Sequence, residues 1–143
     1  MTRGSGEPVA VAGVVCAGTR FEGMLWGEIQ PDGWNATEVL CKMLIQSKFL
    51  PQLHVILLDG ISMGGLNIVD FLLLAKQLKT PCVAVMRKQP DLRAIEQAMQ
   101  RVSEPQQRLE IIRRAGDIYE HPPFYFQVSG ANSTARSLKY LGV

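Results

Sequence analysis

The chain has 143 residues, of which 47% are hydrophobic and 20% are charged, and its formal net charge is +2 at pH 7. Its mean hydropathy is +0.07. These values exclude a disordered or collagen-like chain, and a chain of this length buries enough surface to hold a core without disulfides. One domain spanning residues 1–143 is expected. No stretch approaches the about 20 apolar residues of a membrane span, so no membrane partner is expected.

The N-terminal region and the cysteines indicate a cytoplasmic protein. The apolar run at residues 9–17 is too short for a signal peptide and lacks a small residue at a cleavage site. Cys16, Cys41 and Cys82 are odd in number and widely spaced, which fits neither a disulfide framework nor a metal motif. We therefore expect three buried, reduced thiols.

The first predicted elements are an antiparallel hairpin and a helix. Residues 9–17 are apolar at almost every position, which predicts a strand buried on both faces. A turn at residues 18–22 leads to a second strand over residues 24–29, which a Pro-Asp-Gly turn ends. Asn35 and Glu38 have the spacing of a capping box, which predicts that a helix begins at residue 36 and ends near residue 48.

A strand, a loop and a helix follow. The aliphatic residues 54–58 predict a short strand that ends at Asp59, and a glycine-bearing loop comes next. A helix is expected to begin near Asn67, with Asp70 in its first turn. Residues 82–86 predict another strand, and the right-handed crossover through the helix makes these two strands parallel.

The C-terminal third predicts helices and one strand. Two helices are expected between residues 92 and 115, with a second capping box at Ser103 and Gln106. Residues 124–128 predict a last strand, and a final helix is expected over residues 132–141. The summed order indicates an α/β fold with a mixed sheet flanked by helices. Chemistry is expected at the carboxyl ends of the parallel strands.

Asp59 is the most informative acidic residue because it ends an aliphatic strand and opens the segment DGISMGG. With a second carboxylate from Asp32 or Glu38, it would hold Mg²⁺, which prefers carboxylate and water oxygens. Each residue also has a structural interpretation: Asp59 as an acceptor for loop amides, Asp32 as a turn residue and Glu38 as part of the capping box. Gly64 and Gly65 precede a helix and would cradle an anion on free amides.

Basic side chains are concentrated in one segment. Residues 87–114 carry seven basic and four acidic groups. The basic ones are Arg87, Lys88, Arg93, Arg101, Arg108, Arg113 and Arg114. Such a face would bind the phosphates of DNA or RNA, and exposed aromatic residues such as Trp26 and Trp34 would stack on bases. The alternative interpretation is the solvated side of two helices, with the aromatic residues packed in the fold.

Five stretches of the chain carry a family resemblance. They are residues 21–27 (FEGMLWG), 32–38 (DGWNATE), 55–61 (VILLDGI), 65–70 (GLNIVD) and 81–91 (PCVAVMRKQPD). In this order they closely resemble an uncharacterised, largely archaeal family, the domain-of-unknown-function family numbered ninety-nine, which is regarded as endonuclease V-like. The resemblance covers nearly the whole chain.

This resemblance implies a ribonuclease H-like fold related to endonuclease V, a Mg²⁺-dependent enzyme that cuts nucleic acid near deaminated bases. In endonuclease V a strand that ends in Asp-Gly supplies a metal-binding carboxylate, which by motif is Asp59 here. A second acidic ligand would correspond to Glu38 or Asp32. The family usually begins with a central strand that carries a further metal-binding aspartate in a Gly-Ile-Asp-Asp-like motif, and residues 1–8 contain no such strand. In endonuclease V basic residues follow the Asp-Gly motif, whereas residues 61–66 of this chain contain none.

The expected function is that of a diverged endonuclease V-like protein that handles DNA or RNA and would cleave phosphodiesters with a divalent metal ion. Asp59, Asp32 and Glu38 would be the catalytic and Mg²⁺-binding carboxylates. Arg87, Lys88 and Arg93 would bind the nucleic-acid backbone. The alternative is a non-catalytic module that keeps the fold and binds nucleic acid or protein.

Overall fold

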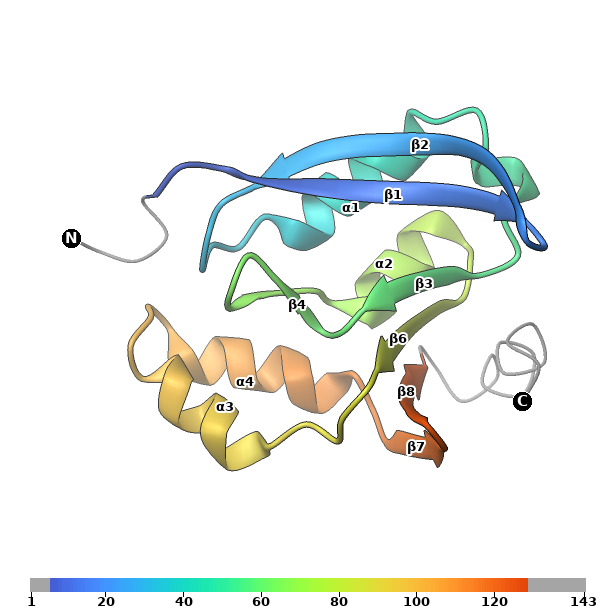
Figure 1. Cartoon of the computed structure of the whole chain (residues 1–143). Helices are drawn as coiled ribbons and strands as arrows, with labels where there is room; N and C mark the ends of the chain where they lie inside the picture. Colours follow the sequence, from blue (N-terminus) through green and yellow to red (C-terminus); the bar gives the residue numbers. More distant parts are fainter. Residues whose placement is uncertain (1–5, 129–143) are drawn as a thin grey trace.

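The computed structural model describes residues 6–128, in which helices and strands alternate after an N-terminal hairpin (Figure 1). The strands of this part are β1 (Val9–Ala17), β2 (Arg20–Ile29), β3 (Ile56–Asp59), β4 (Ser62–Met63), β5 (Asn67–Ile68), β6 (Cys82–Met86), β7 (Ile118–His121) and β8 (Phe124–Val128). Its helices are α1 (Ala36–Ile45), α2 (Phe71–Leu78), α3 (Leu92–Met99) and α4 (Pro105–Arg114), with a short 3₁₀ helix at Leu50–Gln52. The expected mixed α/β class is confirmed. The helix expected at residues 132–141 lies outside the described residues.

A mixed sheet forms the centre of this part of the chain. Its strand order is β3-β6-β8-β7 within residues 6–128. The parallel pairing of β3 with β6 is confirmed, and it sets Asp59 opposite Val85. β8 pairs antiparallel with both β6 and β7. β7 was not expected from the sequence, since it is short and mostly exposed.

β1 and β2 form the expected antiparallel hairpin, but they do not join the mixed sheet. In residues 6–128 they make a sheet of their own, and so do the short strands β4 and β5. A bulge between Val15 and Cys16 shifts the register near the hairpin turn. The expected mixed sheet is present as four strands, and the hairpin is separate from it within the described residues.

The main core lies on one side of the strands, where the helices cover them. Figure 1 shows α1 behind the hairpin and α2 behind β3. Because side chains alternate along a strand, Ile56 and Leu58 point into this core while Leu57 is 52% exposed. Phe71 and Leu74 fill it from α2 and are almost fully buried. Among the helices of residues 6–128, none is long and apolar enough to cross a membrane.

β1 is buried on one face only, so the prediction of two buried faces is wrong. Val15 is buried and Val11 is half buried, whereas the alternate residues from 10 to 16 are exposed. The reason is that α1 packs on one side of the hairpin, and no element of residues 6–128 covers the other side. Cys16 lies on the uncovered side and is exposed, while Cys41 and Cys82 are buried as expected.

Both predicted capping boxes are wrong. Asn35 precedes α1 but makes no side-chain cap; its Oδ1 accepts from the Gln30 amide at 3.1 Å instead. Glu104 precedes α4 with φ 51°, and its side chain does not cap the helix. The Oγ of Ser103 accepts from Arg108 rather than from a helix amide. The first helix also ends earlier than expected, at Ile45.

Candidate functional site

Asp59 lies at the carboxyl end of β3 and its side chain is exposed. It borders a cavity of about 630 Å³. No hydrogen bond or ion pair joins the Asp59 side chain to another residue within the described part of the chain. Its carboxylate thus makes no hydrogen bond that would stabilise the loop, unlike the carboxylate of a structural turn residue.

The cavity beside Asp59 separates the hairpin from the mixed sheet. Residues 11–16 of β1 line it on one side, and residues 52–59, which include β3, line it on the other. Its remaining wall includes Leu40, Met43 and Leu44 of α1. Within residues 6–128, β1 pairs only with β2 and β3 pairs only with β6. Each of these two strands therefore presents one unpaired backbone edge, and both edges border the same cavity.

Asp32 holds the loop that follows β3. The residue is buried in a turn with φ 53°, and its amide donates to the Gly64 carbonyl at 2.8 Å. Its Oδ1 accepts from the Leu66 amide at 2.8 Å. A Cβ at Gly65 would collide with this carboxylate. The place where the sequence predicted an external anion is thus taken by the carboxylate of Asp32.

Arg108 is buried, with 1% of its surface exposed, so it does not belong to a phosphate-binding face. Its Nη1 donates to the carbonyls of Gly33 at 2.9 Å and Leu66 at 2.8 Å. Nε and Nη2 donate to the carbonyl and the hydroxyl of Ser103. Burial lowers the pKa of Arg108, and the negative charges of Asp32 and Glu104 oppose that shift.

The ring of Trp34 lies beneath the Arg108 guanidinium, with 4.3 Å between Cζ and the ring centroid. One face of this indole is therefore covered by a cation from within the fold. The other predicted tryptophan, Trp26, is 63% exposed on the hairpin.

Asn67 joins the two loops at this end of the molecule, a role that the sequence did not indicate. Its side chain is fully buried, and Oδ1 accepts from the Ala36 amide at 3.0 Å. Its Nδ2 donates to the Gln30 carbonyl and to Asn35 Oδ1, both at 3.0 Å. The residue was expected at the start of a helix, but the helix begins four residues later with Asp70 as its cap.

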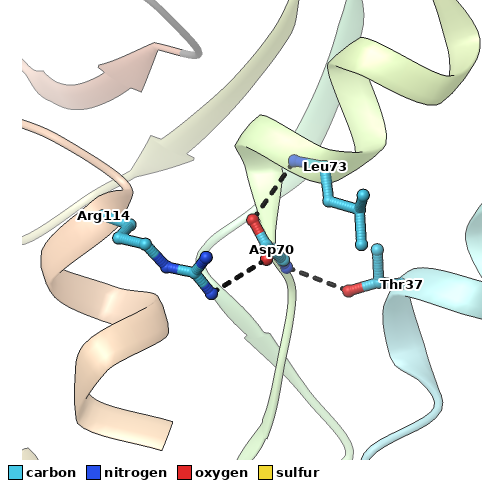
Figure 2. A network of polar contacts seen from close by, with 4 residues as sticks. All are labelled: Thr37, Asp70, Leu73 and Arg114. Atoms are coloured by element: carbon cyan, nitrogen blue, oxygen red, sulfur yellow. Dashed lines mark hydrogen bonds and ion pairs between the residues drawn. The ribbon is translucent and has the colours of Figure 1, made fainter. Parts of the chain in front are cut away.

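Asp70 joins three helices through polar contacts (Figure 2). Its Oδ1 accepts from the Leu73 amide at 3.2 Å, which caps α2. Its Oδ2 pairs with Arg114 of α4 at 3.2 Å, and its amide donates to the Thr37 hydroxyl of α1 at 2.9 Å. The Arg114 guanidinium is thus engaged in an ion pair within the fold.

Glu38 lies in the first turn of α1 and is exposed. It lines a second cavity, of about 470 Å³, together with Trp34, Asp70 and Ile111. Asp59 borders the first cavity and Glu38 lines the second, so the two carboxylates do not face the same cavity. Among residues 6–128, no group of three or more His, Cys, Asp or Glu side chains lies close enough to hold a metal ion.

Of the seven basic side chains in residues 87–114, four are exposed and have no hydrogen bond or ion pair to another described residue. They are Arg87, Lys88, Arg93 and Arg101. Arg87 and Lys88 directly follow β6, the parallel neighbour of β3, so they leave the sheet at the same edge as Asp59. Arg113 is exposed too, but it pairs with Glu110 at 3.6 Å.

The chain is similar to archaeal proteins along most of its length. A family model described as "Endonuclease dU" matches residues 1–138. A UPF0215 protein of Methanosarcina barkeri is 39% identical over 129 residues, which are 87% of this chain and 66% of that protein. A UPF0215 protein of Archaeoglobus fulgidus is 38% identical over 120 residues, which are 84% of this chain and 66% of that protein. The chain thus spans about two thirds of the length of these curated relatives.

A solved structure has the same arrangement. The crystal structure of a protein of unknown function from Archaeoglobus fulgidus superposes with a TM-score of 0.89 at 35% sequence identity. The match covers 94% of this chain and 78% of that chain.

Proposed function

The chain belongs to the Endonuclease dU family, and from this premise we propose that it handles nucleic acid as a diverged, divalent-metal-dependent endonuclease related to endonuclease V. The family description names an endonuclease, and dU is the usual abbreviation of deoxyuridine, the nucleoside that deamination of deoxycytidine leaves in DNA. DNA that contains a deaminated base is therefore the proposed substrate, with RNA as the second nucleic acid to test. The observation that carries this proposal is the uncommitted carboxylate of Asp59 at the carboxyl end of a parallel strand.

The donor chemistry of Asp59 fits Mg²⁺. This ion is usually held by one or two carboxylates together with water and substrate phosphates, so a site does not require three protein ligands. When bound, the ion would stabilise charge on the phosphoryl oxygens and lower the pKa of a bound water. Asp59 would hold it. Glu38 and Asp32 are the other carboxylates proposed for this site, but Glu38 lines the other cavity and Asp32 already accepts a hydrogen bond from Leu66.

Arg87, Lys88 and Arg93 would bind the phosphate backbone near Asp59. Arg87 and Lys88 extend from β6, whose Val85 lies opposite Asp59 in the parallel register. A duplex or single strand that contacts these side chains would therefore run past the carboxylate.

The hairpin and the four-stranded mixed sheet would together form one ribonuclease H-like sheet if one further strand lay between β1 and β3. Three features support this proposal: the two unpaired edges border the same cavity, β1 and β3 point in opposite directions in Figure 1, and the lining is mostly apolar. Six extended residues span about 20 Å, which matches the six residues of β1 that line the cavity, while β3 contributes four residues to the opposite edge. The relatives are longer by about a third, so a longer chain could supply such a strand. A carboxylate on it would lie beside Asp59.

The test is a cleavage assay on DNA and RNA that contain a single uracil or inosine, with Mg²⁺ or Mn²⁺. Asp59→Asn should reduce the rate by about 100-fold or more, because a metal ligand is lost. Asp117→Asn removes another exposed carboxylate, between α4 and β7, and should leave the rate unchanged. Equal rates in wild type and Asp59→Asn would contradict the assigned role, and absent cleavage in both would contradict the enzymatic proposal.

A non-catalytic binding module is the second candidate, and one observation favours it. Arg87, Lys88 and Arg93 are exposed and unpaired among the described residues, so they can bind phosphates without a metal ion. Such a module would bind nucleic acid with a strong salt dependence and without turnover. Titration of the same oligonucleotides at rising salt, followed by gel analysis for cleavage, distinguishes the two functions. Absence of binding at low salt would point to a protein partner instead.

A further inference from the structure

The outer face of the β1–β2 hairpin is apolar and uncovered. Three consecutive cross-strand pairs build it: Ala12 with Trp26, Val14 with Met24, and Cys16 with Phe21. All six side chains are exposed. The four large ones, Val14, Phe21, Met24 and Trp26, are 58%, 61%, 57% and 63% exposed. We call these six residues the hairpin face.

The opposite side of the hairpin shows what a covered face looks like in this molecule. Val15 and Ile29 are buried there, and Leu25 is half buried against the core. A sheet with one solvated face normally alternates apolar and polar residues, whereas β1 carries apolar residues or glycine at every position. The sequence of this strand is therefore that of a strand covered on both faces.

The charge of the hairpin argues against nucleic acid as the occupant. None of the six side chains of the hairpin face is charged. The nearest charges are Arg20 and Glu22, which pair with each other at 2.6 Å, and Glu28 at the end of β2. A surface that binds phosphates would carry unpaired basic groups. An apolar protein surface fits the hairpin face better.

We propose that the hairpin face binds the same face of a second copy of this chain, in a dimer with two-fold symmetry. An isologous contact needs a self-complementary surface, and a patch of aliphatic and aromatic side chains without charge meets that requirement. With side-chain areas of about 150–250 Å² for large residues, the four large side chains expose about 450 Å² per copy. Together with the small residues between them, two copies would bury about 1,000 Å², the lower limit of a specific interface.

An interface of this size gives a weak dimer, with an expected dissociation constant of about 1–100 μM. Sedimentation velocity of the full 143-residue chain over this concentration range measures it. Met24→Glu should abolish the dimer, because it would bury an unpaired charge in the interface. Ile45→Glu is the matched control: Ile45 is also 57% exposed, but it lies at the end of α1 on the helical side. This variant should dimerise like wild type.

A second readout uses the exposed thiol of the hairpin face. Cys41 and Cys82 are buried, so Cys16 is the accessible cysteine for a thiol reagent in the folded chain. Its rate of modification should fall several-fold as the wild-type concentration rises through the dissociation constant, and it should stay constant in Met24→Glu. A wild-type chain that stays monomeric at the highest concentration overturns the proposal. The proposal is also overturned if Met24→Glu dimerises like wild type, or if Ile45→Glu loses the dimer as Met24→Glu does. Growth of the wild type into open-ended assemblies would overturn it as well.

Discussion

Asp32 and Arg108 hold Leu66 from its two backbone ends. The carboxylate of Asp32 accepts from the Leu66 amide, and the guanidinium of Arg108 donates to the Leu66 carbonyl, each at 2.8 Å. Arg108 also donates to the carbonyl of Gly33, the residue that follows Asp32. The turn before α1 and the loop after β3 are thereby fixed to α4 by buried charges, which are costly unless they are fully bonded. The loop that begins at Asp59 is consequently held at its far end.

Gly65 should be intolerant of alanine, whereas Gly60 should accept it at modest cost. Both residues have positive φ, +82° and +88°, so alanine is strained by about 1 kcal/mol at either position. A Cβ at Gly65 would also collide with the Asp32 carboxylate, while at Gly60 it meets no atom within 4 Å. We expect Gly65→Ala to lose about 3 kcal/mol of unfolding free energy and Gly60→Ala about 1 kcal/mol. Urea denaturation of the two variants measures the difference, and equal losses would contradict the close contact.

Arg108→Met should lower the free energy of unfolding by about 3 kcal/mol. The change keeps the length of the side chain but leaves the buried carbonyls of Gly33 and Leu66 without their donor, and it leaves Asp32 without its compensating charge. Arg101→Met is the control, because Arg101 is exposed and should change stability by less than about 0.5 kcal/mol. A loss in Arg108→Met as small as that of the control would show that the guanidinium does not hold these loops.

Asp70 should contribute more as a helix cap than as an ion-pair partner. Asp70→Ala removes the acceptor for the Leu73 amide and the contact with Arg114, so a loss of about 1.5 kcal/mol is expected. Asp70→Asn keeps a capping oxygen and loses only the charge. Since the Arg114 side chain is 50% exposed, this loss should be about 0.5 kcal/mol and should vanish at high salt. A double-mutant cycle with Arg114→Gln separates the two contributions. A coupling energy between Asp70 and Arg114 above about 1 kcal/mol would contradict the prediction that the cap contributes more than the ion pair.

Local pattern was sufficient for most helices and strands but not for the polar contacts between them. The strands at 54–58 and 82–86 were predictable because each is a short aliphatic run bounded by turn residues. Asn35 and Asn67 were interpreted as helix caps, which is their commonest use. Their actual bond joins residues 32 apart in the sequence, and residue spacing carries no information on such a contact.

Of the candidate site residues, only the position of Asp59 in the fold was predictable. Asp59 could be singled out because a carboxylate at the end of an aliphatic strand must emerge at the carboxyl edge of the sheet. The fate of Asp32 depends on a left-handed turn that directs its carboxylate to Gly65 and Leu66. Arg108 occurs in an ordinary basic segment, and its burial follows from carbonyls 75 and 42 residues away. Neither outcome could be derived from neighbouring residues.

The buried thiol of Cys82 should make the fold less stable above pH 9. Burial raises the pKa of Cys82 from 9.0 to about 12. Between these values the unfolded chain loses the thiol proton and the folded chain retains it, so stability falls as pH rises, by about 1.4 kcal/mol per pH unit. Denaturation curves at pH 8 to 10.5 should therefore decline more steeply for wild type than for Cys82→Ala. Cys16→Ala should keep the wild-type slope, and a Cys82→Ala slope equal to wild type would contradict the shift.

The basic residues after β6 should determine how nucleic-acid binding depends on salt. Each phosphate contact that is lost reduces the slope of log K against log salt by about 0.9 for duplex DNA. If Arg87 and Lys88 each neutralise one phosphate, the double variant Arg87→Gln/Lys88→Gln should lower the slope by about 2 and weaken binding at every sequence tested. Arg113→Gln provides the control, because Arg113 pairs with Glu110 on α4 and was assigned no phosphate. Fluorescence anisotropy at several salt concentrations measures both slopes. An unchanged slope in the double variant would place the nucleic acid elsewhere and remove the link between this edge and Asp59.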